Sequence, residues 1–165
     1  MTVIAARRYA SGRISAETLA LDGAPRGPLP AGTFDWVGLA NPDVAEMDLA
    51  CRQFGLHLLA AEGALNPPQM PKGEVYGRHL FIVARSAAIE EGETIGYGQT
   101  ALFLGADFLV TVRVGSTRAH IALRERLETD VERLAEGPDF VAHAILDFVV
   151  DGYQPIMDRL EIAVQ

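Results

Sequence analysis

The stretch of residues 54–83 reads FGLHLLAAEGALNPPQMPKGEVYGRHLFIV and contains clear helix and strand signals. Its alanine-rich part, Leu58 to Leu65, is typical of a short helix. The dipeptide Pro67-Pro68 stops that helix, because proline lacks the backbone N–H that a helix interior needs. The apolar run at the end of the stretch, Leu80 to Val83, is typical of a buried strand. The stretch therefore predicts a fold that contains both helices and strands.

The residues before this stretch predict a hairpin, a loop, a strand and a helix. Residues 2–10 and 13–21 favour strands on either side of the turn dipeptide Ser11-Gly12. Residues 22–33 carry three prolines and three glycines, which predicts a loop, and residues 34–39 resume a strand. In the segment Asn41-Pro42-Asp43, we expect an N-cap followed by proline at the first helical position, and a helix that Gly55 ends.

The residues after it predict further strands and then helices. Strands are expected at about 74–76, 79–88, 95–104 and 107–114, and helices at 116–127, 131–134 and 138–165. This order predicts an α/β fold in which a mixed central sheet has helices on both faces. Its adjacent central strands should hold Trp36 and three apolar runs, at 80–83, 101–104 and 108–112. We divide the chain into an α/β/α domain, residues 1–137, and a C-terminal helix, residues 138–165.

Composition excludes several classes of function. The chain has 165 residues, a formal net charge of −8 and a single lysine, Lys72, which argues against a nucleic-acid or phosphate-binding surface. The single cysteine, Cys51, cannot form an internal disulfide. The four histidines have no zinc-site spacing, and no nucleophile triad is recognisable, so we expect no enzyme activity.

No apolar stretch approaches the roughly 18 residues that span a bilayer, and the first residues do not form a secretory signal. We therefore expect a soluble chain in the cytosol. The final predicted helix shows no stop signal after Glu161, where glycine and proline are absent, which predicts that the natural chain continues.

The last predicted helix carries a stripe of acids at spacings of four, seven and three: Asp147, Asp151, Asp158 and Glu161. At about 100° per residue these side chains project from one side of a continuous helix. A solvated face is one interpretation of the stripe. A site for Mg²⁺ is the other, because hard cations prefer carboxylate oxygens.

The motifs taken together resemble the cytoplasmic domain of CorA-like divalent metal-ion transporters. The matching residues are Trp36, Phe54-Gly55-Leu56-His57, Leu59, Glu62, Leu65, Gln69, Pro71-Lys72, Glu74, Tyr76, Leu80 to Val83, and residues 103–105, 107–113, 144–147 and 150–153. The resemblance implies an α/β/α domain that leads into a stalk helix. In the family, two transmembrane helices and a Gly-Met-Asn pore motif follow, and this sequence contains neither.

The resemblance also implies a regulatory cation site between subunits, formed by acids of the last helix and of the short second helix. Glu62, Asp147 and Asp151 are the candidate metal ligands in this sequence. Gly63 stands where the family has an aspartate, and removing one carboxylate weakens the field at such a site. Leu58 and Met70 also depart from the pattern, where proline and arginine are usual.

The hypothesis from the sequence is thus a cytoplasmic domain of a transporter or channel for Mg²⁺, or for Co²⁺, Ni²⁺ or Zn²⁺, that contributes to assembly and cation-dependent gating. The expected partners are further copies of the chain, five in the family, and divalent cations. No tightly bound cofactor is expected, only weak Mg²⁺, and the membrane is reached only through the missing C-terminal region. A stand-alone regulatory module of the same fold and a carboxylate-based metal enzyme remain the alternatives.

Overall fold

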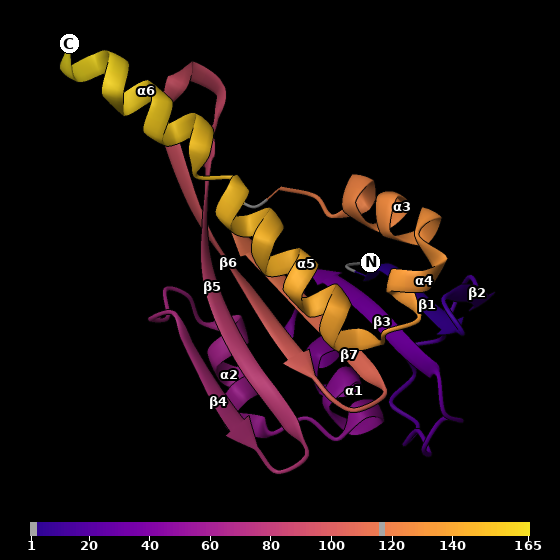
Figure 1. The fold of residues 1–165 in the computed structure, drawn as a ribbon. Coiled ribbons are helices and arrows are strands. Elements are labelled where there is room, and N and C mark those ends of the chain that lie inside the picture. Colours follow the sequence, from indigo (N-terminus) through magenta and orange to yellow (C-terminus); the bar gives the residue numbers. More distant parts are fainter. Residues whose placement is uncertain (1–2, 116–117) are drawn as a thin grey trace.

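The computed structural model describes residues 3–115 and 118–165. Within them lie seven strands and six α-helices (Figure 1). The strands are β1 (Val3–Ala10), β2 (Arg13–Ala16), β3 (Thr33–Ala40), β4 (Lys72–Tyr76), β5 (His79–Ile89), β6 (Ile95–Leu104) and β7 (Phe108–Gly115). The helices are α1 (Val44–Phe54), α2 (Leu58–Leu65), α3 (Ile121–Thr129), α4 (Val131–Leu134), α5 (Pro138–Asp151) and α6 (Gln154–Val164), with a 3₁₀ turn, η1 (Glu91–Glu93), between β5 and β6.

All seven strands form one mixed sheet in the order β2-β1-β3-β7-β6-β5-β4. The β3–β7 pair is parallel, with Trp36 beside Leu109, and the other pairs are antiparallel. The expected central strands are therefore neighbours, as predicted. Their apolar runs are explained by burial on both faces: Val37, Leu102, Leu109 and Val110 are at most 1% exposed.

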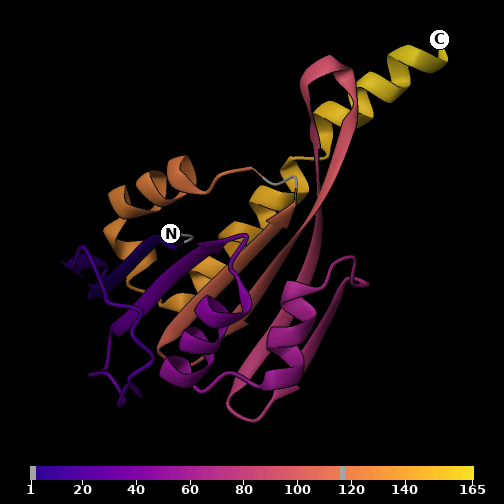
Figure 2. The same cartoon turned by 180° about the vertical axis from the view of Figure 1, so that it is seen from behind.

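Helices cover both faces of the sheet, which confirms the α/β/α class. On one face, α1 and α2 pack over a core that contains Met47, Ala60 and Phe81. On the other face, α3, α4 and α5 pack over a core that contains Trp36, Leu123 and Ile145. Figure 2, seen from behind, shows α1 and α2 in front of the strands and α5 beyond them.

The start of α1 differs from the prediction. Asp43, not Asn41, is the N-cap: its side chain accepts a hydrogen bond from the backbone N–H of Glu46, and the Glu46 side chain accepts one from the N–H of Asp43. This reciprocal capping box places Pro42 before the helix. Asn41 instead accepts a hydrogen bond from the N–H of Gly115 at 3.1 Å, which ties the end of β3 to the end of β7.

Two other boundaries are also corrected. The helix expected from residue 116 begins at Ile121 and ends at Thr129, and residues 116–117 lie outside the described residues. The second strand of the predicted hairpin ends at Ala16 rather than at residue 21. The turn itself is confirmed, since Ser11 and Gly12 both have positive φ.

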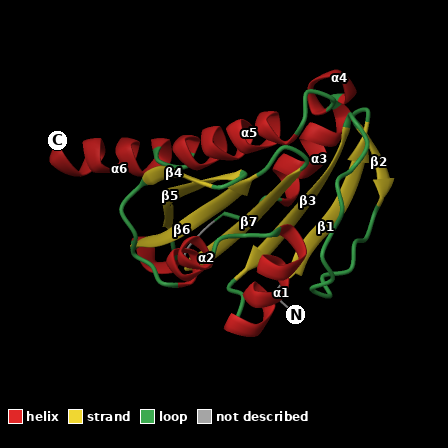
Figure 3. Ribbon diagram, turned by 90° about the horizontal axis from the view of Figure 1, so that it is seen from below, coloured by secondary structure: helices red, strands yellow, loops and turns green. Residues whose placement is uncertain are grey.

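The predicted helix 138–165 is two helices rather than one. α5 ends at Asp151 and α6 begins at Gln154, with Gly152 and Tyr153 between them. Pro155 explains the interruption, because it has no N–H to donate to the carbonyl of Asp151. Both intervening residues keep right-handed helical dihedral angles, so α6 continues in roughly the direction of α5 (Figure 3).

Among the helices that the structure describes, none combines the length and the apolar character that crossing a bilayer requires.

Candidate functional site

The three predicted metal ligands lie on opposite faces of the sheet. Asp147 and Asp151 are exposed and one turn apart on α5, whereas Glu62 is exposed on α2. The sheet separates the two helices within one chain. The structure therefore brings Asp147 and Asp151 together and leaves Glu62 apart from them.

Within residues 3–115 and 118–165, no three histidine, cysteine or acidic side chains are close enough to hold a metal ion. The acidic stripe is also divided by the break after α5: Asp158 belongs to α6 and accepts a hydrogen bond from Gln154 at 2.6 Å. Within the described part of one chain, these acids therefore do not form a complete cation site.

The surface of α6 is unusually apolar for an exposed helix. Ile156 is buried, but Leu160 is 54% exposed, and Met157, Ile162 and Val164 are more exposed still. The helix rests on the hairpin of β5 and β6, through an ion pair of Arg159 with Glu93 at 2.5 Å and a hydrogen bond from the Tyr153 hydroxyl to the carbonyl of Arg85. Figure 1 shows α6 beside the tip of this hairpin, beyond the rest of the sheet.

The segment Phe54-Gly55-Leu56-His57 has a structural role in this chain. Phe54 and Leu56 are buried in the core under α1 and α2, and Gly55 takes the left-handed conformation that ends α1. The ring of His57 caps α2, because its Nδ1 accepts a hydrogen bond from the backbone N–H of Leu59. The backbone N–H of His57 donates to Nε2 of His79. Burial lowers the pKa of His79. The segment therefore joins α1, α2 and β5.

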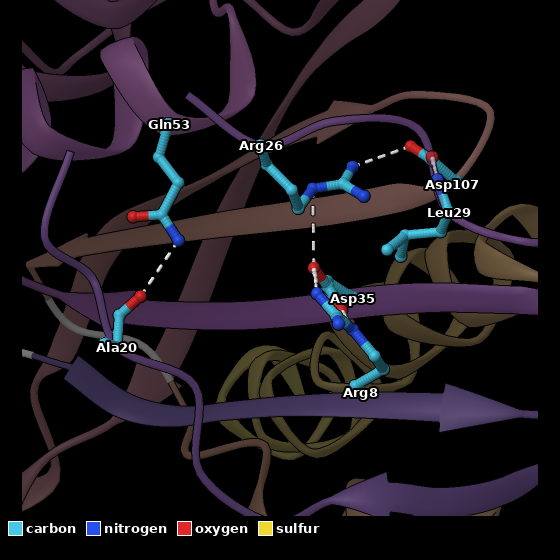
Figure 4. A network of polar contacts seen from close by, with 7 residues as sticks. All are labelled: Arg8, Ala20, Arg26, Leu29, Asp35, Gln53 and Asp107. Carbon is cyan, nitrogen blue, oxygen red and sulfur yellow. Dashed lines mark hydrogen bonds and ion pairs between the residues drawn. The ribbon is translucent and has the colours of Figure 1, made fainter. Parts of the chain in front are cut away.

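A network of charged side chains at one end of the sheet was not predicted (Figure 4). Asp35, 1% exposed, accepts two hydrogen bonds from Arg8, at 2.7 and 3.0 Å, and pairs with Arg26 at 3.4 Å. Arg26 also donates to Asp107 at 2.7 Å, and Asp107 accepts a further bond from the N–H of Leu29. The network fastens the proline-rich loop to β1, to β3 and to the turn between β6 and β7.

The network stabilises the charged form of Asp107. Burial alone would raise its pKa, but the hydrogen bonds from Arg26 and Leu29 outweigh that effect, so the pKa lies below its usual value. The only sequence signal for the network was Asp35, a carboxylate inside an otherwise apolar strand. Its partners could not be found, because Arg26 and Asp107 are 81 positions apart.

Comparisons with known proteins define the class of the fold. Over 98% of this chain and 49% of the other, the structure is similar to the full-length CmaX protein, with a TM-score of 0.74 and 16% identity. It is also similar to the soluble domain of CorA from Methanocaldococcus jannaschii, over 99% of this chain and 62% of that domain, with a TM-score of 0.65 and 18% identity. The fold is thus that of the soluble domain of CorA.

The sequence identifies the family. The profile of the family described as CorA-like Mg²⁺ transporter protein matches residues 31–165, so the chain belongs to that family, one of metal ion transporters. YfjQ of Bacillus subtilis, named as a candidate metal ion transporter, is 30% identical over 126 residues. That match covers 76% of this chain and 39% of YfjQ, so the chain spans about two fifths of the length of this relative.

Proposed function

We propose that the chain is the cytoplasmic domain of a divalent metal cation transporter or channel, with magnesium as the foremost candidate among Mg²⁺, Co²⁺, Ni²⁺ and Zn²⁺. The observation that carries the proposal is the family match, which runs from the loop before β3 to the last residue of the sequence. In the proposal, the domain lies at the cytoplasmic face of the membrane, and the rest of the transporter follows residue 165.

The domain would work as an assembly of identical copies, five in the full-length transporter. Support comes from α6, whose exposed apolar side chains include Leu160 and Val164. Burial of apolar surface is the main driving force for association, so such a face favours contact with another copy. The helices α5 and α6 would then form the subunit contact that leads to the membrane.

Cations would act between copies. Asp147 and Asp151 are exposed on one side of α5, and Glu62 is exposed on the opposite face of the same chain. Two neighbouring copies can therefore present α5 of one to α2 of the other, which is the arrangement that a shared cation requires. A cation bound there would favour one quaternary state over another and so couple cation concentration to the gate.

The test follows the self-association of the chain while Mg²⁺, Co²⁺, Ni²⁺ or Zn²⁺ is added. Divalent cations are expected to promote association more than Na⁺ at equal ionic strength, and the double variant Asp147→Asn, Asp151→Asn should abolish the difference. Glu136→Gln, which removes an exposed acid between α4 and α5, is the matched control. A cation effect that is equal in all variants would reflect screening alone and contradict the proposed site.

A further inference from the structure

A second candidate site lies on the face of the sheet that α3 covers. There, a cavity of about 220 Å³ opens between α3 and the strands β1, β3 and β7. Side chains two residues apart on a strand point to the same face, which places Arg7, Trp36 and Arg113 on the cavity side. Arg124 reaches the same cavity from α3.

Two of these arginines are buried without an acidic partner. Arg113 is 8% exposed and Arg124 is 6% exposed. In the described part of the chain, neither forms an ion pair. Buried charges in proteins are normally paired, because removing an ion from water costs several kcal/mol. Neither guanidinium group is therefore directly paired with a carboxylate, and Arg124 is attracted by Glu128 only without direct contact.

The contacts that these arginines do make are with neutral groups. Arg113 donates a hydrogen bond to the carbonyl of Arg118 at 3.1 Å. Arg124 donates to the hydroxyl of Tyr9 at 3.1 Å and stacks over the ring of Trp36 at 3.7 Å. These contacts hold the guanidinium groups in place, but they do not neutralise them.

Two acids, Glu125 and Glu128, lie near this group of arginines, and Glu128 is already engaged. Glu128 accepts hydrogen bonds from Arg7 at 2.6 Å and from the hydroxyl of Tyr9 at 2.7 Å. Glu125 lines the cavity as well, but it is exposed, so water weakens its attraction for the arginines. The excess of positive charge is thus local, in a chain whose formal net charge is −8.

The pKa of His120 also reflects the excess of positive charge in this cavity. It is the N-cap residue of α3, it is 8% exposed, and its ring meets the ring of Phe148 edge-on. Burial, together with Arg113, Arg124 and Arg118, lowers its pKa to about 4. At neutral pH the ring is therefore uncharged.

The floor of the cavity is open because residue 38 is glycine. A Cβ at this position would lie 3.5 Å from the hydroxyl oxygen of Thr111 and 3.8 Å from Nη2 of Arg124. A side chain here would thus occupy the space in front of the guanidinium group. The volume of the cavity is below the range of about 300 to 1,000 Å³ that is usual for larger organic ligands, which favours a small one.

We infer that this cavity binds a small oxyanion of the phosphate class, either the free ion or the phosphate group of a small metabolite, held by Arg113 and Arg124. Guanidinium groups suit such ligands, because their planar arrays of N–H donors match the spacing of phosphate oxygens. The chain as a whole is acidic, with a formal net charge of −8, so it offers no extended basic surface for a nucleic acid. The proposed ligand is therefore a small anion inside the cavity. The inference is independent of the proposed transport function.

The test measures phosphate binding to the 165-residue chain by calorimetry and by thermal unfolding. Inorganic phosphate is expected to stabilise the chain more than NaCl at equal ionic strength. Arg113→Gln should weaken binding about tenfold or more, because a hydrogen bond to a charged group contributes at least that factor. Gly38→Val, which fills the cavity and keeps its charge, should weaken binding to a similar extent.

The control is Arg52→Gln, which removes an exposed arginine of α1 that pairs with Asp48 and should leave affinity unchanged. Glycerol 3-phosphate distinguishes the two sources: tighter binding than inorganic phosphate indicates a phosphorylated metabolite, and weaker binding indicates the free ion. Equal binding by all variants, or no effect beyond that of NaCl, overturns the inference. So does a loss of self-association in Arg113→Gln without phosphate binding, since a carboxylate of a second copy would then fill the cavity.

A spectroscopic readout on the unaltered chain covers the case in which a variant does not fold. A bound anion offsets the charge of Arg113, Arg118 and Arg124, so saturating phosphate should raise the pKa of His120 in an NMR titration. The exposed His143 on α5 serves as the internal control. Equal responses of the two histidines, or no response of His120, would show that the cavity is empty.

Discussion

Helices α5 and α6 are both amphipathic and are separated by only Gly152 and Tyr153, yet they differ in what they contact. α5 buries Val141, Ile145 and Val149 against the sheet. α6 buries only Ile156 and leaves Leu160 54% exposed. The difference lies in the surroundings, because the sheet ends where α6 begins and only the β5–β6 hairpin continues beside it. The apolar face of α5 is thus already covered within the chain, whereas that of α6 is left exposed, which supports the proposed contact between copies.

The largest contrast is expected from truncating one apolar side chain on each helix. Ile145→Ala removes a fully buried side chain of α5 and should lower the free energy of unfolding by about 2 to 5 kcal/mol. Leu160→Ala on α6 should lower it by less than about 1 kcal/mol, because the side chain is largely in water already. Urea denaturation at low protein concentration measures both. Equal losses would mean that α6 belongs to the folded core as fully as α5.

A second contrast, between a hydrogen-bonded acid and an exposed acid, should appear when the pH is varied. Asp107→Asn disrupts hydrogen bonds with Arg26 and Leu29 and should cost about 1 to 3 kcal/mol at pH 7. Because the folded-state pKa of Asp107 lies below its usual 3.8, the stability that it contributes is present above that pH and is lost as the pH falls through the folded-state value. Stability curves of the wild type and the variant should therefore converge in acid.

The matched control for Asp107 is Asp151→Asn on α5, an exposed acid that should change stability by less than about 0.5 kcal/mol when divalent cations are absent. A pH-independent loss in Asp107→Asn would show that the side chain acts through packing rather than through its charge.

The smallest effect is expected from Mg²⁺. A site with a dissociation constant of about 1 mM would stabilise the fold by roughly 1.8 kcal/mol at about 20 mM ion. We expect less than half of that, because Gly63 removes one carboxylate. Thermal unfolding in Mg²⁺, against Na⁺ at equal ionic strength, measures the effect. A large Mg²⁺-specific shift would show that the missing carboxylate matters little.

Gly63→Asp extends this prediction. A Cβ at Gly63 would meet Phe81 at 3.8 Å, an ordinary contact, so the substitution fits. The added acid should increase the response to Mg²⁺, and Asp147→Asn in the same background should cancel the gain. Because the sheet lies between α2 and α5 of one chain, such coupling can arise only between copies. Coupling in a strictly monomeric sample would contradict the intersubunit site.

The sequence predicted the central sheet because burial on both faces leaves apolar runs, as at Leu109 and Val110. It predicted the ends of α1 and α2 because Gly55 and Pro67 mark them. It did not predict the break after Asp151: Gly152 and Pro155 were visible, but the apolar period continues across them. The clusters of charged side chains could not be predicted from the sequence, for a different reason. Arg113 and Arg124 meet only because β7 and α3 pack together, and no local pattern records that contact.

The C-terminal helices are proposed to associate between copies. Sedimentation velocity of the 165-residue chain, from low to high protein concentration, measures this association. We expect weak, concentration-dependent association that the double variant Leu160→Ser, Val164→Ser abolishes while thermal stability at low concentration stays unchanged. A strict monomer at every concentration, or association that the double variant leaves intact, would contradict it.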